Sequence, residues 1–413
     1  MPPVAAAKGT VTVRVLDEFG QPAPDAWARV EDSRGAGWQS PATGAGDVVL
    51  RDIVAGPAKV TAGARGLYES EPVTVQVAAD QDNRLDVMLQ PRNAATAALL
   101  GARTVSKSAD GSRVVLEVDI AVIDERGQPM LGLTAADVSM PQWYCGFDAA
   151  HFCIRGPNGG SAGHWQSTTG RPDSFELVIA PARHLFAAGL LIDQGDRIAE
   201  SLADPARVEG LTEFLGSFVG ANSIALAEYS TRSDAPILRT HGGFVSDGRM
   251  LLPAISGLAQ RIGGASPTVL ATSLMLEFVQ QQSPDQPAAL VVIGGGWEFD
   301  EYATQGEFDV MLHSAATPIT TIGFGDLYAA ISAAQVAQAT GGASVRVNFP
   351  AQYRTALRGL EQLLAGAMPF YRMRFSVDVV PAGSAVPGSI LFTSVRVEVT
   401  ERDDLSVMVA LPL

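Results

Sequence analysis

The chain has 413 residues, of which 47% are hydrophobic and 18% charged, a composition typical of a globular protein rather than a disordered one. Its length exceeds one ordinary core and predicts roughly two to four domains. The formal net charge is −15. Because no dense Lys/Arg cluster offsets this charge, a phosphate backbone would be repelled, which argues against nucleic acid as a partner.

The sequence contains no apolar stretch of the roughly 18–20 residues that a membrane span needs, so we expect no membrane insertion. Its start, MPPVAAAKGTVTV, lacks the basic residues and apolar core of a signal peptide. The two cysteines, Cys145 and Cys153, lie close together in QWYCGFDAAHFCIRG. This spacing favours a local disulfide in an oxidising compartment over two buried thiols. We therefore expect a secreted, periplasmic or cell-surface protein whose signal peptide is absent from this sequence.

Residues 1–92 alternate apolar and polar positions in short runs that end in Gly, Pro or Asp, such as GTVTVRVLDEFGQP, GDVVLRDIV and RLDVMLQP. Runs of this length predict a small antiparallel β-sandwich. A second β module begins near residue 93 and includes SRVVLEVDIAVIDERGQP. The two modules share a turn, VLDEFGQP at 15–22 and VIDERGQP at 122–129, which ends a strand at Asp, turns through Gly and leaves through Pro.

Between residues 185 and 367 the pattern changes. Continuous apolar runs, AAGLLID, SIALAEYS, ALVVIGGG and PITTIGFG, alternate with stretches of helical apolar spacing such as SLMLEFVQQQ and YRTALRGLEQLLAGA. Strands that are apolar on both faces suit a parallel sheet covered by helices. Residues 185–367 are therefore predicted to form a doubly wound α/β domain.

The last part of the chain returns to strand alternation in FYRMRFSVDVV, SILFTSVRVEVT and LSVMVALPL. These strands are too few for a domain of their own. We predict that they complete an Ig-like sandwich made of 93–184 plus 368–413. The predicted fold class is thus multidomain, with two antiparallel β-sandwich modules and a doubly wound α/β domain inserted before the C-terminal strands.

Several stretches of the α/β part match one family in order: GLLIDQGDRI, GGASPTVLATSLMLEFV, ALVVIGGGWEFD, TTIGFGD and VAQATGGASVRV. In these stretches the chain resembles the von Willebrand factor A (vWA) domain, in the branch found in bacterial secreted proteins. DIAVIDERGQPMLGLTAADVSM is similar to the β segment that often precedes this domain. Residues 1–92 resemble carboxypeptidase-regulatory-like domains through their G-x-V-x-D-x-x-G-x-P style of opening. The resemblance implies a Rossmann-like vWA fold that binds other proteins.

The family carries a metal-ion-dependent adhesion site at the C-terminal edge of its sheet. Its pattern is Asp-x-Ser-x-Ser in the first loop, a Thr in the second and an Asp in the third, oxygen ligands that suit Mg²⁺. Carried over, Asp193 matches the first Asp and Thr268 the Thr, whereas the serines fall on Gly195 and Arg197 and the third-loop Asp on Gly295. The resemblance thus implies a degenerate site that needs no metal cofactor.

Other residues of these loops enter the prediction. Asp196 could supply an oxygen beside Asp193 and Thr268, which is the alternative of a Mg²⁺-dependent vWA adhesin. Arg197 is either a solvated, idle side chain or a guanidinium that pairs with one of the two aspartates in place of the ion. Open α/β sheets bind ligands at this edge, so we expect the partner to contact these residues and two from the third loop, Trp297 and Glu298.

The sequence offers little for catalysis, and we predict that the protein is not an enzyme. GGSAG at 159–163 satisfies G-x-S-x-G, but a nucleophile at Ser161 needs a strand before it and a helix after it, whereas we expect a Gly/Ser/Pro-rich loop. Cys145, His151, Cys153 and His164 fit no standard zinc spacing.

The leading prediction is therefore a non-enzymatic adhesion or protein–protein interaction protein. The alternatives are the Mg²⁺-dependent adhesin, a structural component of an envelope assembly, and a serine hydrolase that uses Ser161. Aromatic residues around the cysteines either pack the second module's core or form another contact surface; they are Trp143, Tyr144, Phe147 and Phe152.

Overall fold

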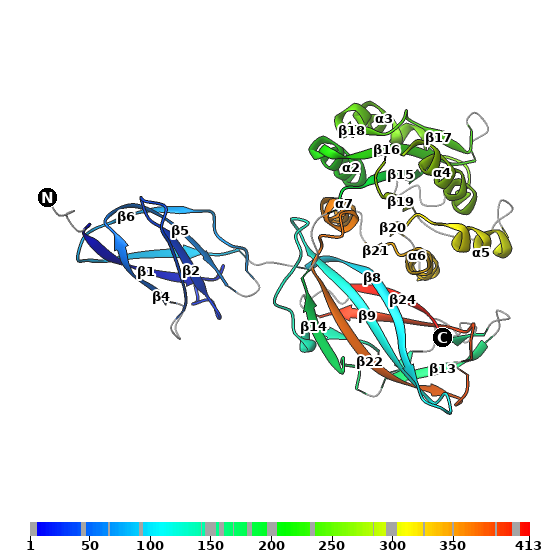
Figure 1. Cartoon of the computed structure of the whole chain (residues 1–413), viewed down its shortest axis with the longest axis horizontal. Helices are drawn as coiled ribbons and strands as arrows, with labels where there is room; N and C mark the ends of the chain where they lie inside the picture. Colours follow the sequence, from blue (N-terminus) through cyan, green and yellow to red (C-terminus); the bar gives the residue numbers. More distant parts are fainter. Residues whose placement is uncertain are drawn as a thin grey trace. The chain divides into compact units, whose positions relative to one another are not determined.

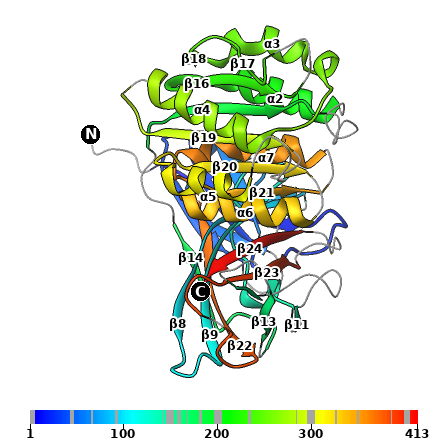
Figure 2. The same ribbon diagram turned by 90° about the vertical axis from the view of Figure 1, so that its right-hand side faces the viewer.

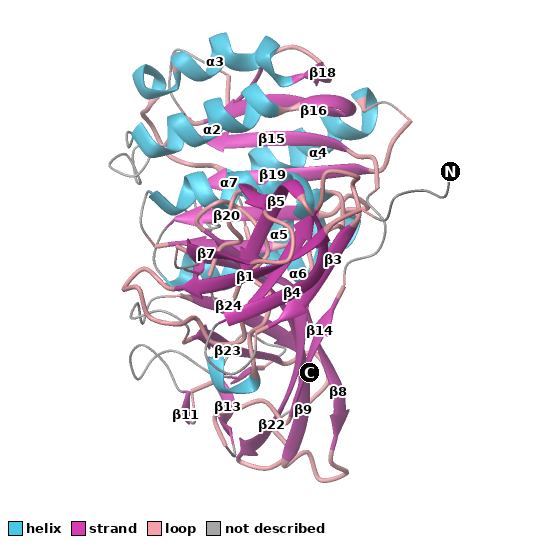
Figure 3. Cartoon of the chain, turned by 90° about the vertical axis from the view of Figure 1, so that its left-hand side faces the viewer, coloured by secondary structure: helices cyan, strands magenta, loops and turns pink. Residues whose placement is uncertain are grey.

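The computed structural model describes residues 6–413 apart from 43–46, 65–66, 91–93, 142, 145–153, 157–160, 168, 180–183, 196–204, 232–235, 284, 295–303, 325–326, 349–350, 385 and 399–404. The chain divides into two compact units, Met1–Asn93 and Ala94–Leu413. Both are rich in strands, and the described helices belong to the second unit (Figure 3). The multidomain, β-rich chain expected from the sequence is confirmed. No helix within the described ranges is long and apolar enough to cross a membrane.

The first unit contains two sheets, with strand orders β4-β1-β7 and β3-β2-β5-β6. Both contribute fully buried residues to one core, such as Val13 and Val30. One pairing departs from the antiparallel prediction, because β7 runs parallel to β1. Since β7 follows β6 of the other sheet, the connection crosses between sheets and imposes no hairpin geometry. The strands are β1 Lys8–Leu16, β2 Trp27–Glu31, β3 Gly37–Pro41, β4 Asp47–Val54, β5 Gly56–Gly63, β6 Val73–Val77 and β7 Asp82–Met88.

The turn shared by the two β modules has the same hydrogen bonds in both places. The carboxylate of Asp17 accepts two backbone N–H groups of its own turn, at 2.9 and 2.8 Å. The carboxylate of Asp124 likewise accepts two, both at 2.9 Å. Gly20 and Gly127 complete the turns at φ +74° and +78°, a region that glycine enters without steric penalty. The turn chemistry expected from the two sequences is therefore present in both modules.

The second unit contains a parallel sheet with strand order β16-β15-β19-β20-β21 (Figures 1 and 2). The four apolar runs form four of these strands, because Leu190 and Ile192 face one helical layer while Leu191 faces the other. Two short strands, β17 and β18, pair antiparallel with β16 at one edge. The strands are β15 Ala187–Asp193, β16 Val219–Tyr229, β17 Leu238–Thr240, β18 Val245–Asp247, β19 Ala288–Gly294, β20 Ile319–Phe324 and β21 Ser344–Val347.

Helices cover both faces of this sheet (Figure 1). Helices α2, α3 and α7 pack on the face of Leu190, and α4, α5 and α6 pack on the face of Leu191. The helix expected at SLMLEFVQQQ begins earlier than predicted, at Thr268, and α5 was not expected. The helices are α2 Pro205–Ser217, α3 Leu252–Ser256, α4 Thr268–Gln282, α5 Gln305–Ser314, α6 Leu327–Thr340 and α7 Ala351–Leu364.

In the remaining strands of the second unit, segments before and after the α/β part pair with each other. Strand β22 pairs antiparallel with β9, β13 and β14, and β23 pairs with β10, β12 and β24. Trp165 and Phe375 are fully buried in their core. The strands are β8 Ala94–Lys107, β9 Arg113–Asp124, β10 Val138–Ser139, β11 Trp143–Tyr144, β12 Ile154–Arg155, β13 Ser161–Ser167, β14 Ser174–Val178, β22 Phe370–Val380, β23 Ile390–Val397 and β24 Ser406–Pro412.

Strand β8 connects the two parts of the second unit. Its Ala98 and Leu99 pair antiparallel with Val345 and Ser344 of β21, at the edge of the parallel sheet. The same strand continues along β9 to Lys107. Its first six residues are buried, and its later ones are partly or fully exposed. One strand thus carries hydrogen bonds of both parts, which explains why residues 94–413 form a single compact unit.

Candidate functional site

The candidate site lies at the C-terminal edge of the parallel sheet. Asp193 is the last residue of β15, Tyr229 of β16 and Gly294 of β19, and β15 lies between the other two strands. The chain passes from β15 to β16 on one side and later returns to β19 on the other, so the strand order reverses beside Asp193. Open α/β sheets place ligands at such a reversal.

The side chain of Asp193 is buried and hydrogen-bonded by the protein itself. Its Oδ1 accepts the backbone N–H of Gly195 at 2.8 Å and the hydroxyl of Ser266 at 2.8 Å. Asp193 has no exposed surface. One donor follows β15 and the other precedes α4, so two loops meet on this carboxylate.

Ser266 is a site residue that the sequence did not reveal. A Cβ added to Gly195 would overlap the Ser266 hydroxyl and would lie 3.1 Å from the backbone carbon of Ala265. The second loop therefore supplies a hydroxyl beside the position where the family pattern has a first-loop serine. The only sequence signal for Ser266 was its neighbour Thr268 in ASPT, which the family pattern places in the site. The contact of Ser266 with Asp193 could not be predicted, because it depends on how the two loops approach each other in the folded protein.

Thr268 and Tyr229 form the next layer of the site. Their hydroxyl groups are hydrogen-bonded at 2.9 Å, and both residues are buried. Burial, and then the negative charge of Asp193, hold the pKa of Tyr229 well above its ordinary value. A Cβ on Gly294 would lie 2.8 Å from the Asp193 Cβ and 3.1 Å from the Tyr229 hydroxyl. Glycine at the end of β19 thus allows these side chains to pack together.

A buried arginine contacts the main chain of Asp193. Arg207, in the first turn of α2, has no exposed surface, and its Nη1 donates to the backbone oxygen of Asp193 at 3.2 Å. Burial lowers the pKa of Arg207, while Tyr353 and Asp193 oppose that shift. Burial raises the pKa of Tyr353 in α7, so its hydroxyl is neutral at neutral pH. The sequence did not single out Arg207, because an arginine in a helix usually lies at the surface.

The structure brings together Asp193, Gly195 and Thr268 among the residues predicted for the site. The other predicted positions lie outside the described residues; they are Asp196, Arg197, Gly295, Trp297 and Glu298. Cys145, Cys153, Phe147 and Phe152 also lie outside them.

Two predictions on the second β module can be compared with the structure. Ser161 was expected in a loop, but it begins strand β13, where its register partner is Arg155 of β12. The loop was expected because glycine and serine are frequent there, whereas cross-strand pairing decides the backbone. Trp143 and Tyr144 form β11, which pairs with β13.

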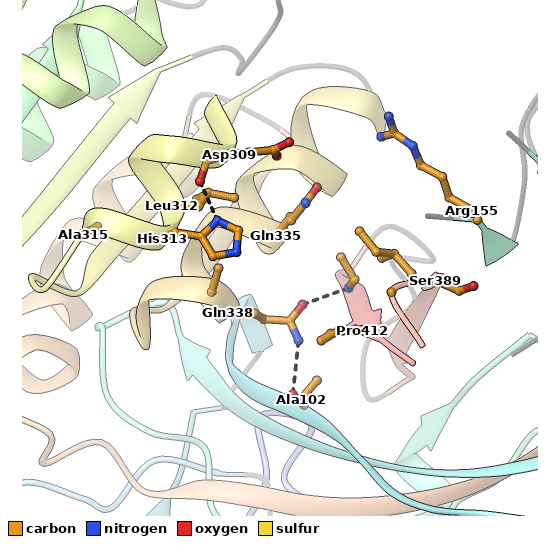
Figure 4. A pocket seen from close by; sticks show the side chains of 15 residues that line it. Ala102, Arg155, Asp309, Leu312, His313, Ala315, Gln335, Gln338, Ser389 and Pro412 are labelled. Atoms are coloured by element: carbon orange, nitrogen blue, oxygen red, sulfur yellow. Dashed lines mark hydrogen bonds between the residues drawn. The ribbon is translucent and has the colours of Figure 1, made fainter. Parts of the chain in front are cut away.

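A pocket of about 1030 Å³ lies elsewhere in the second unit, lined by α5, α6, β8, β12, β23 and β24 (Figure 4). Gln338 of α6 bridges two strands at its base. Its Oε1 accepts the backbone N–H of Ala410 at 2.9 Å, and its Nε2 donates to the backbone oxygen of Ala102 at 3.5 Å. Gln335 and His313 project from the helical side. The lining residues include none of the predicted site residues.

Comparison with known proteins gives no matching family model and no matching curated protein. The pilus adhesin RrgA from Streptococcus pneumoniae is similar with a TM-score of 0.29 and 10% identity, covering 98% of this chain and 82% of that one. The ArnB paralog VWA2 from Sulfolobus acidocaldarius has a TM-score of 0.33 and 13% identity, covering 77% and 74%. A von Willebrand factor type A protein from Catenulispora acidiphila has a TM-score of 0.38 and 11% identity, covering 58% and 74%. The solved structures to which this chain is similar thus include vWA proteins.

Proposed function

We propose that this chain is a non-enzymatic protein–protein interaction protein of the adhesion type. Its α/β part, 185–367, acts as a vWA domain that binds the partner at the C-terminal edge of the sheet. A carboxypeptidase-regulatory-like module, 1–92, and an Ig-like module, 93–184 plus 368–413, present this domain. The protein works in a secreted, periplasmic or cell-surface location.

The observation that carries the proposal is the hydrogen bonding of Asp193. A carboxylate that binds Mg²⁺ must offer its oxygens to a near-octahedral ligand set. Here Oδ1 already accepts donors from Gly195 and Ser266, and Gly195 has no hydroxyl to offer. Within the part of the chain that the structure describes, no group of three His, Cys, Asp or Glu side chains could hold a metal ion. The described residues therefore do not fit the ion, which supports a degenerate, metal-independent site.

The contacts of the hydroxyl groups argue against hydrolysis. Ser266 donates to a carboxylate and Tyr229 bonds to Thr268, and neither contact is the serine–imidazole bond of a triad. Ser161 is followed by a strand, whereas the nucleophile elbow of α/β-hydrolases requires a helix at that point. These observations support binding rather than catalysis.

The proposal is tested by immobilising the full chain and capturing partners from envelope extracts of the organism that produces it, with and without EDTA. Ala265 is exposed in the loop that carries Ser266, and its Ala265→Arg variant places a large side chain at the binding edge. Ala316 is also exposed but precedes β20, at the opposite edge of the sheet, so Ala316→Arg is the matched control.

We expect capture that survives EDTA, is lost in Ala265→Arg and is kept in Ala316→Arg. Capture that EDTA abolishes would favour the Mg²⁺-dependent adhesin instead. Equal capture by both arginine variants would place the binding surface elsewhere on the chain.

A further inference from the structure

The pocket beside α5 and α6 contains polar groups whose hydrogen-bonding capacity the protein itself does not use. Its volume of about 1030 Å³ matches the largest ligand pockets, which measure roughly 300–1000 Å³. Helices α5 and α6 form one wall, and β12, β23 and β24 form the other (Figure 4). No described residue of the candidate site at the sheet edge lines it. The pocket is therefore a separate site, beyond the function proposed above.

Arg155 of β12 brings a positive charge to this pocket. It is partly buried, and its side chain extends from the strand toward the helical wall (Figure 4). Arg155 has no hydrogen bond or ion pair with any residue that the structure describes, whereas Arg372 and Arg374 of the same unit both bind carboxylates. A guanidinium binds a carboxylate through two parallel hydrogen bonds. Arg155 is thus free to bind a carboxylate that a ligand brings.

Two side chains of the helical wall offer further hydrogen bonds. Gln338 of α6 uses both ends of its amide to bridge two strands, whereas Gln335, one turn earlier, has no hydrogen-bond partner within the described ranges. Nδ1 of His313 donates to the backbone oxygen of Asp309 at 2.6 Å, which leaves Nε2 of the neutral ring as an acceptor. A side-chain amide and an imidazole acceptor together match the C=O and N–H groups of a peptide backbone.

Much of the remaining lining is apolar. Leu312 lies on the helical wall, and Ile390 and Pro412 lie on the strand wall. Ligand pockets combine such apolar walls with a few polar groups that fix the orientation of the ligand. The net charge of −15 disfavours a ligand with several negative charges. The lining therefore suits a ligand with one carboxylate, peptide groups and an apolar side chain.

We propose that this pocket binds the carboxyl-terminal end of a peptide whose last side chain is apolar. Arg155 binds the terminal carboxylate, and Gln335 and His313 bind backbone groups of the last residues. The apolar wall of Leu312 and Ile390 holds the last side chain. A protein partner is thus recognised through the end of its chain, at a surface distinct from the edge of the parallel sheet.

Two pools of N-acetylated random tetrapeptides test the proposal, one with free carboxyl ends and one with amidated ends. The full chain is immobilised and incubated with each pool, and retained peptides are identified by mass spectrometry. We expect enrichment from the free-acid pool alone, with apolar residues at the last position. No enrichment, or equal enrichment from both pools, would overturn the proposal. Retention of Asp- or Glu-containing peptides from the amidated pool would also overturn it, because the pocket would then bind a side-chain carboxylate.

Variants then test the named side chains by calorimetry with the most enriched free-acid peptide. Arg155→Gln removes hydrogen bonds to a charged group and should weaken binding by on the order of tenfold or more. Arg396→Gln is the matched control, since Arg396 is exposed on β23 and does not line the pocket. Unchanged affinity in Arg155→Gln, or an equal loss in both variants, would refute a specific role for this guanidinium.

Gln335→Leu keeps the test decisive if Arg155→Gln does not fold. The Gln335 amide has no partner among the described residues, so its removal should weaken peptide binding without lowering the Tm. Circular dichroism during heating gives the Tm of each variant. Gln335→Leu that binds the peptide as tightly as wild type would contradict the proposed contact with the peptide backbone.

Discussion

Gly195 and Ser266 share the space beside the Asp193 carboxylate. Any Cβ at 195 would overlap the Ser266 hydroxyl, which would have to rotate away from Oδ1. Since a hydrogen bond to a charged group contributes about 1.5–3 kcal/mol, we expect Gly195→Ser to lower the free energy of unfolding by about that amount. Combined with Ser266→Gly, the new serine can take over the hydroxyl's place, so the double variant should be more stable than Gly195→Ser alone. Urea denaturation of Gly195→Ser, Ser266→Gly and the double variant measures these free energies of unfolding. Additive effects of the two substitutions would show that the two side chains do not compete for the same space.

A second prediction at this scale concerns Glu228 of β16. It is 5% exposed, and Arg261 Nε donates to it at 2.8 Å. Burial alone would raise the pKa of Glu228, but hydrogen bonds from His241 and Arg261 outweigh burial and lower it. A carboxyl whose pKa is lower in the folded protein stabilises it above the unfolded pKa of about 4.3, and this contribution is lost as the pH falls through the folded value.

Glu228→Gln should therefore lower the free energy of unfolding by about 1–3 kcal/mol at pH 6. The difference from wild type should shrink as the pH falls below about 4. Denaturation curves between these pH values check the trend, with Glu277→Gln on the exposed side of α4 as a control. A difference that stays constant with pH would show that the ionised carboxylate is not what stabilises this edge.

At the scale of elements, the two turns DEFGQP and DERGQP allow the same glycine substitution to be compared in two surroundings. Gly127 lies at φ +78° against α7, and a Cβ there would overlap the Cβ of Arg358 and lie 2.9 Å from its backbone carbon. Gly20 lies at φ +74° with nothing within 4 Å of its Cβ position. Gly20→Ala should destabilise its unit by about 1 kcal/mol through backbone strain alone. Gly127→Ala adds overpacking and should cost about 2–5 kcal/mol in the second unit. Equal losses would mean that the turn does not dock tightly on α7.

The bridge made by Gln338 is a second test at this scale. Gln338→Leu leaves the Ala410 N–H without its acceptor, so we expect a loss of about 1–3 kcal/mol. Gln335 lies in the same helix and lines the same pocket, half-buried, so Gln335→Leu is a matched control that should change stability by less than about 0.5 kcal/mol. Urea denaturation of the two variants compares them. Similar small effects would show that water replaces the bridge.

At the scale of the whole molecule, strand pairing predicts where the chain can be cut. Residues 94–413 contain both partners of every pairing of β22 and should unfold cooperatively without residues 1–93. Residues 94–367 lack β22 and expose the edge of β9, so we expect aggregation or no cooperative transition. Circular dichroism during heating measures both fragments. A 94–367 fragment with the same Tm as 94–413 would contradict the dependence on β22.

Much of this architecture was accessible from local patterns. The run AAGLLID became β15 with the predicted ends, because a strand buried on both faces is built from consecutive apolar or small residues, here six, and Asp193 closes it. DEFGQP and DERGQP formed the same turn, since Asx hydrogen bonding and a glycine at positive φ are decided within a few residues. Asp193 and Thr268 could be named as candidate site residues from the sequence, because they match the Asp and Thr of the family's adhesion-site pattern.

Other features could not be predicted because they depend on groups far apart in the sequence. Strand β8 looks like an ordinary strand of one module, but its pairing with β21 is decided by where the α/β sheet ends. Ser266 reaches Asp193 across a separation of 73 residues. The sequence did not single out Arg207, and only the approach of α2 to the end of β15 buries it.

The sequence by itself determined the succession of β-rich and α/β segments, the two shared turns and the place of the candidate site in the chain, because hydrophobic periodicity and turn chemistry act over a few residues. Only the tertiary structure decided the chemistry of that site. It set a hydroxyl from the second loop and a buried arginine around Asp193, since desolvation and hydrogen bonding of a charge depend on every group that packs against it.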